Sequence, residues 1–106
     1  MAKYLIHANY VGDGIKGLLK EGGTGRRAAA MKAIESVGGT IEAFYYAFGD
    51  TDAYLIADMP DHTTMAGAAL AINATGLVTT RTTVLLTPEE IDQATKKTPS
   101  YRPPGQ

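Results

Sequence analysis

The sequence predicts one α+β domain built from four strands and two main helices. Three observations support this fold class. The chain has 106 residues, of which 44% are hydrophobic, which is enough apolar material for one core. Segments with the two-residue periodicity of strands are separated by segments with helical periodicity. Their order is strand, helix, strand, strand, helix, strand, the order of the split βαβ unit.

The N-terminal third is predicted to form a strand and a helix. Lys3 to Tyr10 alternates as a strand does, and its two faces are Tyr4, Ile6 and Ala8 on one side and Leu5, His7 and Asn9 on the other. The stretch from Gly12 to Gly25 is rich in glycine and is predicted to be a loop with a helical start. Thr24 is predicted to cap a helix that ends near Val37, before the stop signal Gly38-Gly39.

The middle of the chain is predicted to form a hairpin. Thr40 to Phe48 is aromatic and alternating, and its faces are Ile41, Ala43, Tyr45 and Ala47 against Glu42, Phe44, Tyr46 and Phe48. The cluster from Gly49 to Asp52 predicts a turn into a third strand, Ala53 to Asp58. The two strands are therefore expected to pair antiparallel.

The remainder of the chain is predicted to contain a helix, a strand and a short terminal helix. Asp61 is a suitable cap for a helix that closes at Gly76, and a fourth strand is expected to follow as far as Leu86. Thr87-Pro88-Glu89-Glu90 is a specific start signal for a helix to about Lys97. We expect a domain over residues 1–97 and an extended or disordered arm over 98–106.

This order of elements is that of a ferredoxin-like fold, with an expected spatial strand order of four, one, three, two and helices on one face. The other face would then expose a set of large apolar residues, namely Leu5, Phe44, Tyr46, Phe48 and Leu85. We expect a second copy to cover this face, so that two sheets pack into a dimeric α/β barrel.

Several segments resemble the GYD domain family, small proteins placed among the dimeric α/β barrels. The resemblance covers roughly Tyr4 to Ala94 and rests on these segments: an arginine at 26 or 27, Glu35 to Tyr45, Gly49 to Asp52, Met59-Pro60-Asp61, Gly76 to Thr82 and Thr87 to Glu90. The tyrosine of the family's motif aligns with Thr51, while Gly49 and Asp52 are retained. The resemblance implies the fold and an oligomer, and it implies no particular activity.

The first candidate site lies on the helix-free face of the predicted sheet. The alternation places five candidate ligand-binding residues there, His7, Asn9, Glu42, Tyr46 and Arg81. An imidazole can act as acid or base near neutral pH, and a guanidinium can hold an anionic oxygen. The alternative is structural: His7 and Arg81 would be cross-strand neighbours that satisfy each other in a filled interface.

A second candidate site is the glycine-rich approach to Arg26 and Arg27. Thr24, Arg26 and Arg27 could hold an anion at a helix start, although the spacing is neither a P-loop nor a dinucleotide motif. The alternative is that both arginines are solvated surface residues.

Composition narrows the functional classes. The formal charge of −1 gives no reason to expect nucleic acid or an anionic membrane as a partner. There is no cysteine and there are only two histidines, His7 and His62, so we expect no metal and no cofactor. No leader or membrane-spanning pattern is visible, so a cytoplasmic location is expected.

The leading functional hypothesis is a homo-oligomer that binds a small, partly apolar or anionic molecule in its barrel cavity. One alternative is a cofactor-free enzyme that uses the same cavity for proton transfer or monooxygenation, by analogy of fold. Another is a purely structural or regulatory oligomer.

Overall fold

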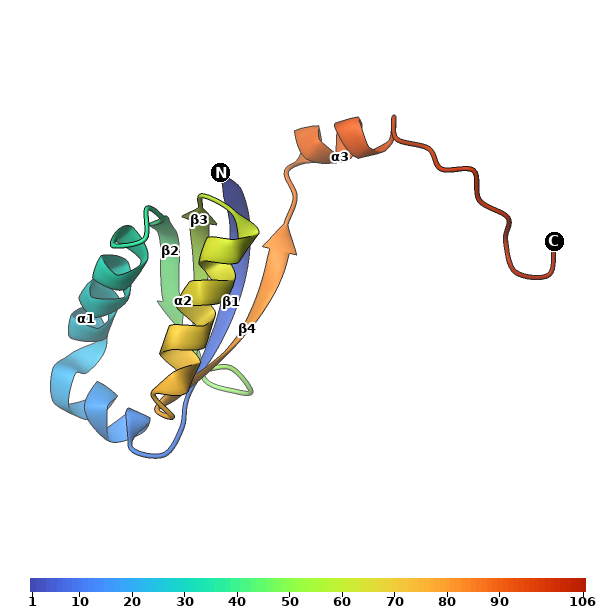
Figure 1. Cartoon of the computed structure of the whole chain (residues 1–106). Coiled ribbons are helices and arrows are strands. Elements are labelled where there is room, and N and C mark those ends of the chain that lie inside the picture. The colour runs from blue at the N-terminus through green and yellow to red at the C-terminus, as the bar shows by residue number, and fades with distance from the viewer.

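The computed structural model describes all 106 residues and contains one antiparallel sheet, two helices on one face of it, and a third helix beyond its edge (Figure 1). The elements are β1 (Ala2–Tyr10), α1 (Gly14–Glu35), β2 (Thr40–Tyr46), β3 (Ala53–Met59), α2 (His62–Ala74), β4 (Val78–Leu85) and α3 (Pro88–Ala94). The α+β class and the predicted order of the elements are confirmed.

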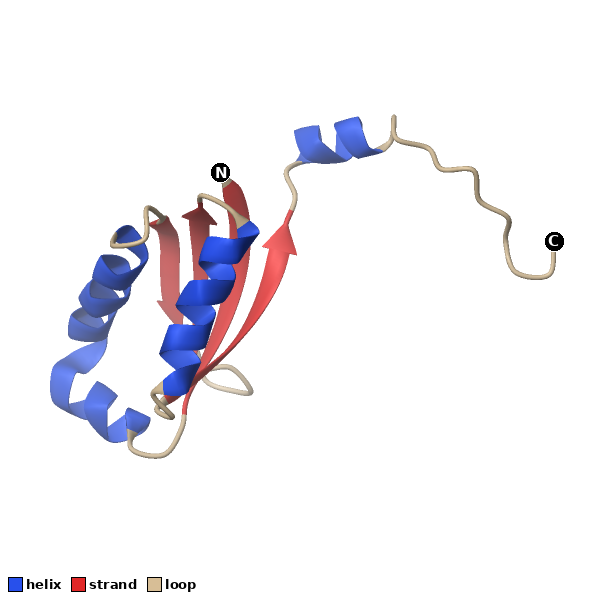
Figure 2. Cartoon of the chain, viewed as in Figure 1, coloured by secondary structure: helices blue, strands red, loops and turns tan.

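The strand order in the sheet is β2-β3-β1-β4, which is four, one, three, two when it is read from the β4 edge, as predicted. All three strand pairings are antiparallel. Helices α1 and α2 lie on the same side of this sheet, so the other side carries no helix (Figure 2). This arrangement is consistent with a ferredoxin-like fold. We call the uncovered side the open face.

The core lies between the sheet and the two helices, and the alternation predicted for β1 is confirmed. Tyr4, Ile6 and Ala8 are buried on the helix side, next to alternate residues of β3. The helices add Ile34 from α1 and Met65 from α2. The alternate residues of β1, including Leu5 and His7, lie on the open face and are only partly buried.

The faces predicted for β2 are wrong in part, because the strand contains a bulge. The register with β3 shifts between Ile41 and Ala43, so one extra residue reverses the side on which all later residues lie. Phe44 therefore pairs with Leu55 of the core, and Tyr46 pairs with Ala53. Both aromatic residues lie on the helix side.

The open face is consequently less aromatic than expected. Phe44 and Tyr46 are absent from it, and Phe48 lies beyond the end of β2 in the following turn, where it is fully exposed. Leu5 and Leu85 lie on the open face as predicted, because Leu85 pairs with Lys3 in the β1 register. Ile56, which pairs with Leu5, is an apolar residue of this face that the prediction missed.

Helix α1 begins earlier than predicted. It is helical from Gly14, so the predicted loop between Gly12 and Gly25 is wrong over most of its length. Gly22 has φ 78° and ψ 168°, a conformation that interrupts the helix and divides it into two segments. The predicted start near Thr24 corresponds to the second segment. Gly38, with φ 88°, has the positive φ that ends a helix, so the predicted stop signal after α1 is confirmed.

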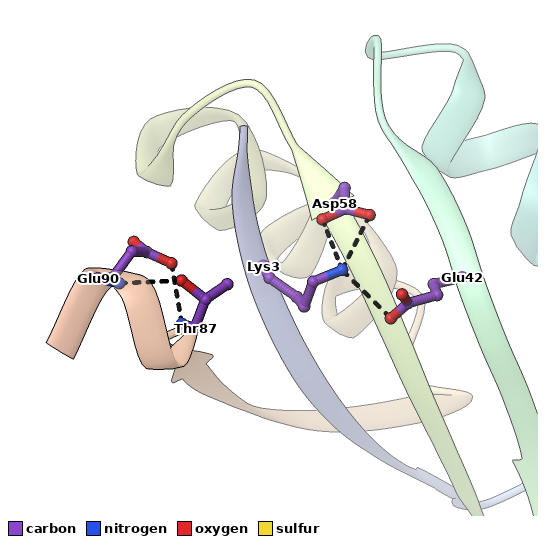
Figure 3. Close-up of polar contacts among 5 residues, drawn as sticks. All are labelled: Lys3, Glu42, Asp58, Thr87 and Glu90. Carbon is purple, nitrogen blue, oxygen red and sulfur yellow. Dashed lines mark hydrogen bonds and ion pairs between the residues drawn. The ribbon is translucent and has the colours of Figure 1, made fainter. Parts of the chain in front are cut away.

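The signals for α2 and α3 are confirmed in detail. The Asp61 side chain accepts a hydrogen bond from the backbone of Thr64 at 2.7 Å. In α3 the Glu90 backbone donates to Thr87 Oγ1 at 3.1 Å, and the Thr87 backbone donates to Glu90 Oε1 at 3.0 Å (Figure 3). This reciprocal pair is a capping box.

The C-terminal part of the chain extends away from the sheet. Helix α3 and the residues after it project past the end of β4 (Figure 1), and no residue of α3 is buried. The radius of gyration is 17.0 Å, whereas a compact chain of this length has about 13 Å. The excess reflects this projecting segment.

Candidate functional site

One row of side chains crosses the open face at a single level. His7 of β1 pairs with Tyr54 of β3 on one side and with Arg81 of β4 on the other. Tyr45 of β2 pairs with Tyr54 and extends the row to the other edge of the sheet. The predicted pairing of His7 with Arg81 is confirmed. We call these four residues the His7 row.

The centre of the His7 row contains a polar atom without a partner. The rings of His7 and Tyr54 meet edge to face, with their centroids 5.1 Å apart and their planes at 65°. His7 Nδ1 is inaccessible to solvent and makes no hydrogen bond within the chain. Because shielded nitrogen atoms of this kind are nearly always bonded in native proteins, this one requires an explanation.

Arg81 lies next to Thr51 of the β2–β3 turn. Its Nη2 donates to Thr51 Oγ1 at 3.5 Å, the long end of the hydrogen-bonding range. Thr51 is only 3% exposed, although it lies in the turn between β2 and β3. Arg81 itself is exposed and has no carboxylate partner, so most of its donor capacity is free.

Asn9, another predicted ligand-binding residue, is occupied in holding the turn. Its Nδ2 donates to the carbonyl of Asp50 at 3.1 Å, and its Oδ1 accepts from the backbone of Asp52 at 2.8 Å. The Asp52 carboxylate accepts from the Tyr10 backbone at 2.9 Å. These bonds tie the β2–β3 turn to β1 and thereby place Thr51 beside Arg81.

Glu42 lies on the open face, but it is not near His7. Lys3 Nζ is 3.2 Å from Glu42 Oε2 and 3.0 Å from Asp58 Oδ1 (Figure 3). Hydrogen bonds to Asp58 and Glu42 raise the pKa of Lys3. Lys3 is four residues from His7 along β1, about 13 Å at the usual rise of a strand. The ionic cluster therefore marks the opposite end of this face.

Tyr46 is on the wrong side of the sheet for the predicted open-face site. Its hydroxyl donates to the Gly23 carbonyl at 2.9 Å, which attaches the kink of α1 to β2. Burial and the neighbouring Tyr10 raise the pKa of Tyr46 to about 12.

The three anion-binding candidates do not converge. Arg26 Nη1 is 3.1 Å from Glu21 Oε2, and this hydrogen bond raises the pKa of Arg26. Arg26 lines a cavity between α1 and the sheet, whereas Thr24 and Arg27 line a shallow hollow next to Phe44 and Tyr46. The candidates therefore do not form one anion site.

The sequence prediction missed Tyr54 and Tyr45 as members of the His7 row. Tyr54 could have been found, because Tyr54, Ile56 and Asp58 alternate with the core residues of β3. No three histidine, aspartate or glutamate side chains lie close enough together to hold a metal ion. No helix has both the length and the apolar character needed to cross a membrane.

Comparison with known proteins places the chain in a family without adding a ligand. No curated protein matches it significantly. Among solved structures it is similar to a protein of unknown function from Nitrosomonas europaea, at 19% identity over 81% of this chain and 90% of that chain, with a TM-score of 0.41. The family model of the GYD domain matches residues 4–95. The chain therefore belongs to the GYD domain family.

Proposed function

We propose that this chain is a homo-oligomeric binding domain that holds a small, partly apolar or anionic molecule against its open face. The observation that carries the proposal is His7 Nδ1, which is shielded from solvent and unbonded between Tyr54 and Arg81. The imidazole would have to turn to present this nitrogen to the open face, and a hydrogen-bond partner outside the chain would then remove the cost of leaving it unpaired.

A second copy is the simplest cover for the open face. Leu5, Ile56 and Leu85 supply apolar contact area, and a two-fold axis would bring the same residues of both copies together.

The His7 row defines the chemistry that such a cavity would accept. Arg81 offers charge-assisted donors to a carboxylate or another anionic oxygen. The aromatic faces of Tyr54 and Tyr45, which are 38% and 72% exposed, offer contact area to an apolar or aromatic body. The unbonded His7 nitrogen could also accept a proton, so proton transfer on the bound molecule is the enzymatic alternative.

The oligomer is tested by analytical ultracentrifugation at micromolar concentration. We expect a dimer or a multiple of dimers for the unchanged chain. Leu5→Lys should shift it to monomers, because it places a charge in the proposed interface. Thr82→Lys places the same charge on the helix side of edge strand β4 and should leave the assembly unchanged. A stable monomer of the unchanged chain would show that the open face is not an interface.

The ligand is tested by native mass spectrometry of the protein purified from its own host. We expect a retained small molecule that is lost in His7→Ala and Arg81→Gln, while the oligomer and its melting temperature change little. If no mass is retained, and if His7→Ala destabilises the oligomer by about 1–3 kcal/mol, His7 is a structural group of the interface instead.

A further inference from the structure

A cavity lies on the helix side of the sheet, between the four strands, α1 and α2. Its volume is about 120 Å³, and twelve of its fourteen lining residues are hydrophobic. Five of them are alanines, and their small side chains leave this space unfilled: Ala8, Ala29, Ala30, Ala33 and Ala53. Ala29 and Ala33 are exposed residues of α1, so the space is partly open to solvent.

Arg26 is the only charged residue that lines this cavity. Arg26, Tyr10, Ile72 and Val78 also line a more open hollow of about 300 Å³ beneath the first segment of α1. The two spaces therefore share a wall that contains the guanidinium. A molecule in either space would therefore lie beside Arg26.

We propose that this cavity binds a molecule with one benzene-sized apolar body and one hydrogen-bond acceptor, with a carboxylate as the preferred acceptor. An apolar cavity of about 150 Å³ in another protein stays dry and binds benzene, so the size is suitable for a single ring. The alanine walls favour an apolar body, and the guanidinium, which can only donate, selects an acceptor.

Arg26 has donors to spare for such a group. Nη1 is bonded to Glu21 through a partly exposed contact of 3.1 Å, and a hydrogen bond with Tyr10 also raises the pKa of Arg26. A guanidinium carries five N–H donors, so others are left. The acidic residues of the outer hollow, Asp13 and Glu21, are paired with Lys16 and Arg26 respectively. The entrance therefore carries balanced charge and does not repel an anion outright.

The test is a titration of the full-length ¹⁵N-labelled chain with three probes of similar size, each built on one benzene ring, followed by NMR chemical shifts. Benzoate has an anionic acceptor, benzyl alcohol a neutral one, and benzylamine a cationic donor. At millimolar probe concentrations we expect shifts at cavity residues with benzoate, weaker shifts with benzyl alcohol, and the weakest with benzylamine.

Variants of three residues separate the cavity from the surface. Ala30→Leu fills the cavity and should abolish binding of all probes without lowering the melting temperature. Ala28→Leu changes an exposed residue of the same helix that does not line the cavity, and should bind as the unchanged chain does. Arg26→Gln should lower the affinity for benzoate about tenfold and the affinity for benzyl alcohol much less, because only the charge-assisted hydrogen bond is lost.

The inference is overturned if no probe shifts the cavity residues, if benzylamine binds as well as benzoate, or if Ala30→Leu leaves binding intact. Should Ala30→Leu fail to fold, Arg26→Gln decides the matter, because an unchanged affinity for benzoate in that variant also overturns the inference. The result is independent of the proposed function, because His7 and the open face lie on the other side of the sheet.

Discussion

At the scale of single residues, polar side chains fall into two groups according to whether their hydrogen bonds are complete within the chain. Asn9 bonds at both ends of its amide to the β2–β3 turn, and Asp61 caps α2. His62, at the start of α2, bonds to the hydroxyl of the buried Tyr4. His7 differs, because its Nδ1 is shielded and has no partner.

The Asp61 cap should make stability depend on pH in a predictable direction. The hydrogen bonds from Thr64 lower the pKa of Asp61 below its usual value of 3.8. Because the pKa of Asp61 is lower in the folded state than in the unfolded state, the stabilisation from this cap is fully present above the usual pKa. It is lost as the pH falls through the pKa of the folded state. Asp61→Ala should therefore lower the melting temperature at pH 7, and this difference from the unchanged chain should narrow below about pH 4.

Asp61→Asn is the matched control, because asparagine is an equally good cap that does not titrate in this range. Thermal melts followed by circular dichroism from pH 7 to pH 2 should show that the Asp61→Asn variant keeps most of the melting temperature of the unchanged chain. An Asp61→Ala difference that stays constant down to pH 2 would mean that the carboxylate is not what holds the helix start.

At the scale of elements, the bulge in β2 decides which aromatic residues belong to the core. Phe44 packs against the core cluster from the helix side, whereas Phe48 is fully exposed in the turn. Phe44→Ala should cost about 2 kcal/mol or more in the free energy of unfolding, while Phe48→Ala should change it by less than about 0.5 kcal/mol. Urea denaturation measures both, and equal effects would contradict the register of β2.

The kink of α1 gives a second prediction at this scale. Gly22 has φ 78° and ψ 168°, a conformation that is essentially confined to glycine and costs a residue with a side chain about 1–3 kcal/mol. Gly22→Ala should therefore destabilise the chain by about that amount. Gly25→Ala, three residues further along, should be neutral or stabilising, because an added Cβ there would make only an ordinary contact with Glu21 at 3.5 Å. A gain in stability for Gly22→Ala would indicate that α1 is continuous.

At the scale of the whole molecule, the domain and the segment after β4 differ in how they are held. The core residues lie between Tyr4 and Met65, whereas α3 has no buried residue and extends away from the sheet (Figure 1). A helix of seven residues is marginal by itself, so its capping box alone does not account for its stability.

The last residues of the chain should matter little for folding of the domain. Pro99 to Gln106 has no apolar periodicity, and its three prolines cannot donate backbone hydrogen bonds. Deleting residues 99–106 should leave the melting temperature nearly unchanged, as measured by calorimetry. A loss of many degrees would show that the arm is a structural part of the oligomer.

The sequence by itself determined the order of the elements, the strand order of the sheet, the caps at Asp61 and Thr87, and the neighbours His7 and Arg81. These features follow from local signals: periodicity, capping chemistry, and the few ways in which such elements can connect. The tertiary structure alone decided that Phe44 and Tyr46 face the helices, and that Arg26 and Arg27 lie in different spaces. The bulge in β2 and the kink in α1 each depend on how the element packs against its neighbours. A one-residue shift in register leaves the alternating pattern of the local sequence unchanged, so periodicity alone does not reveal it.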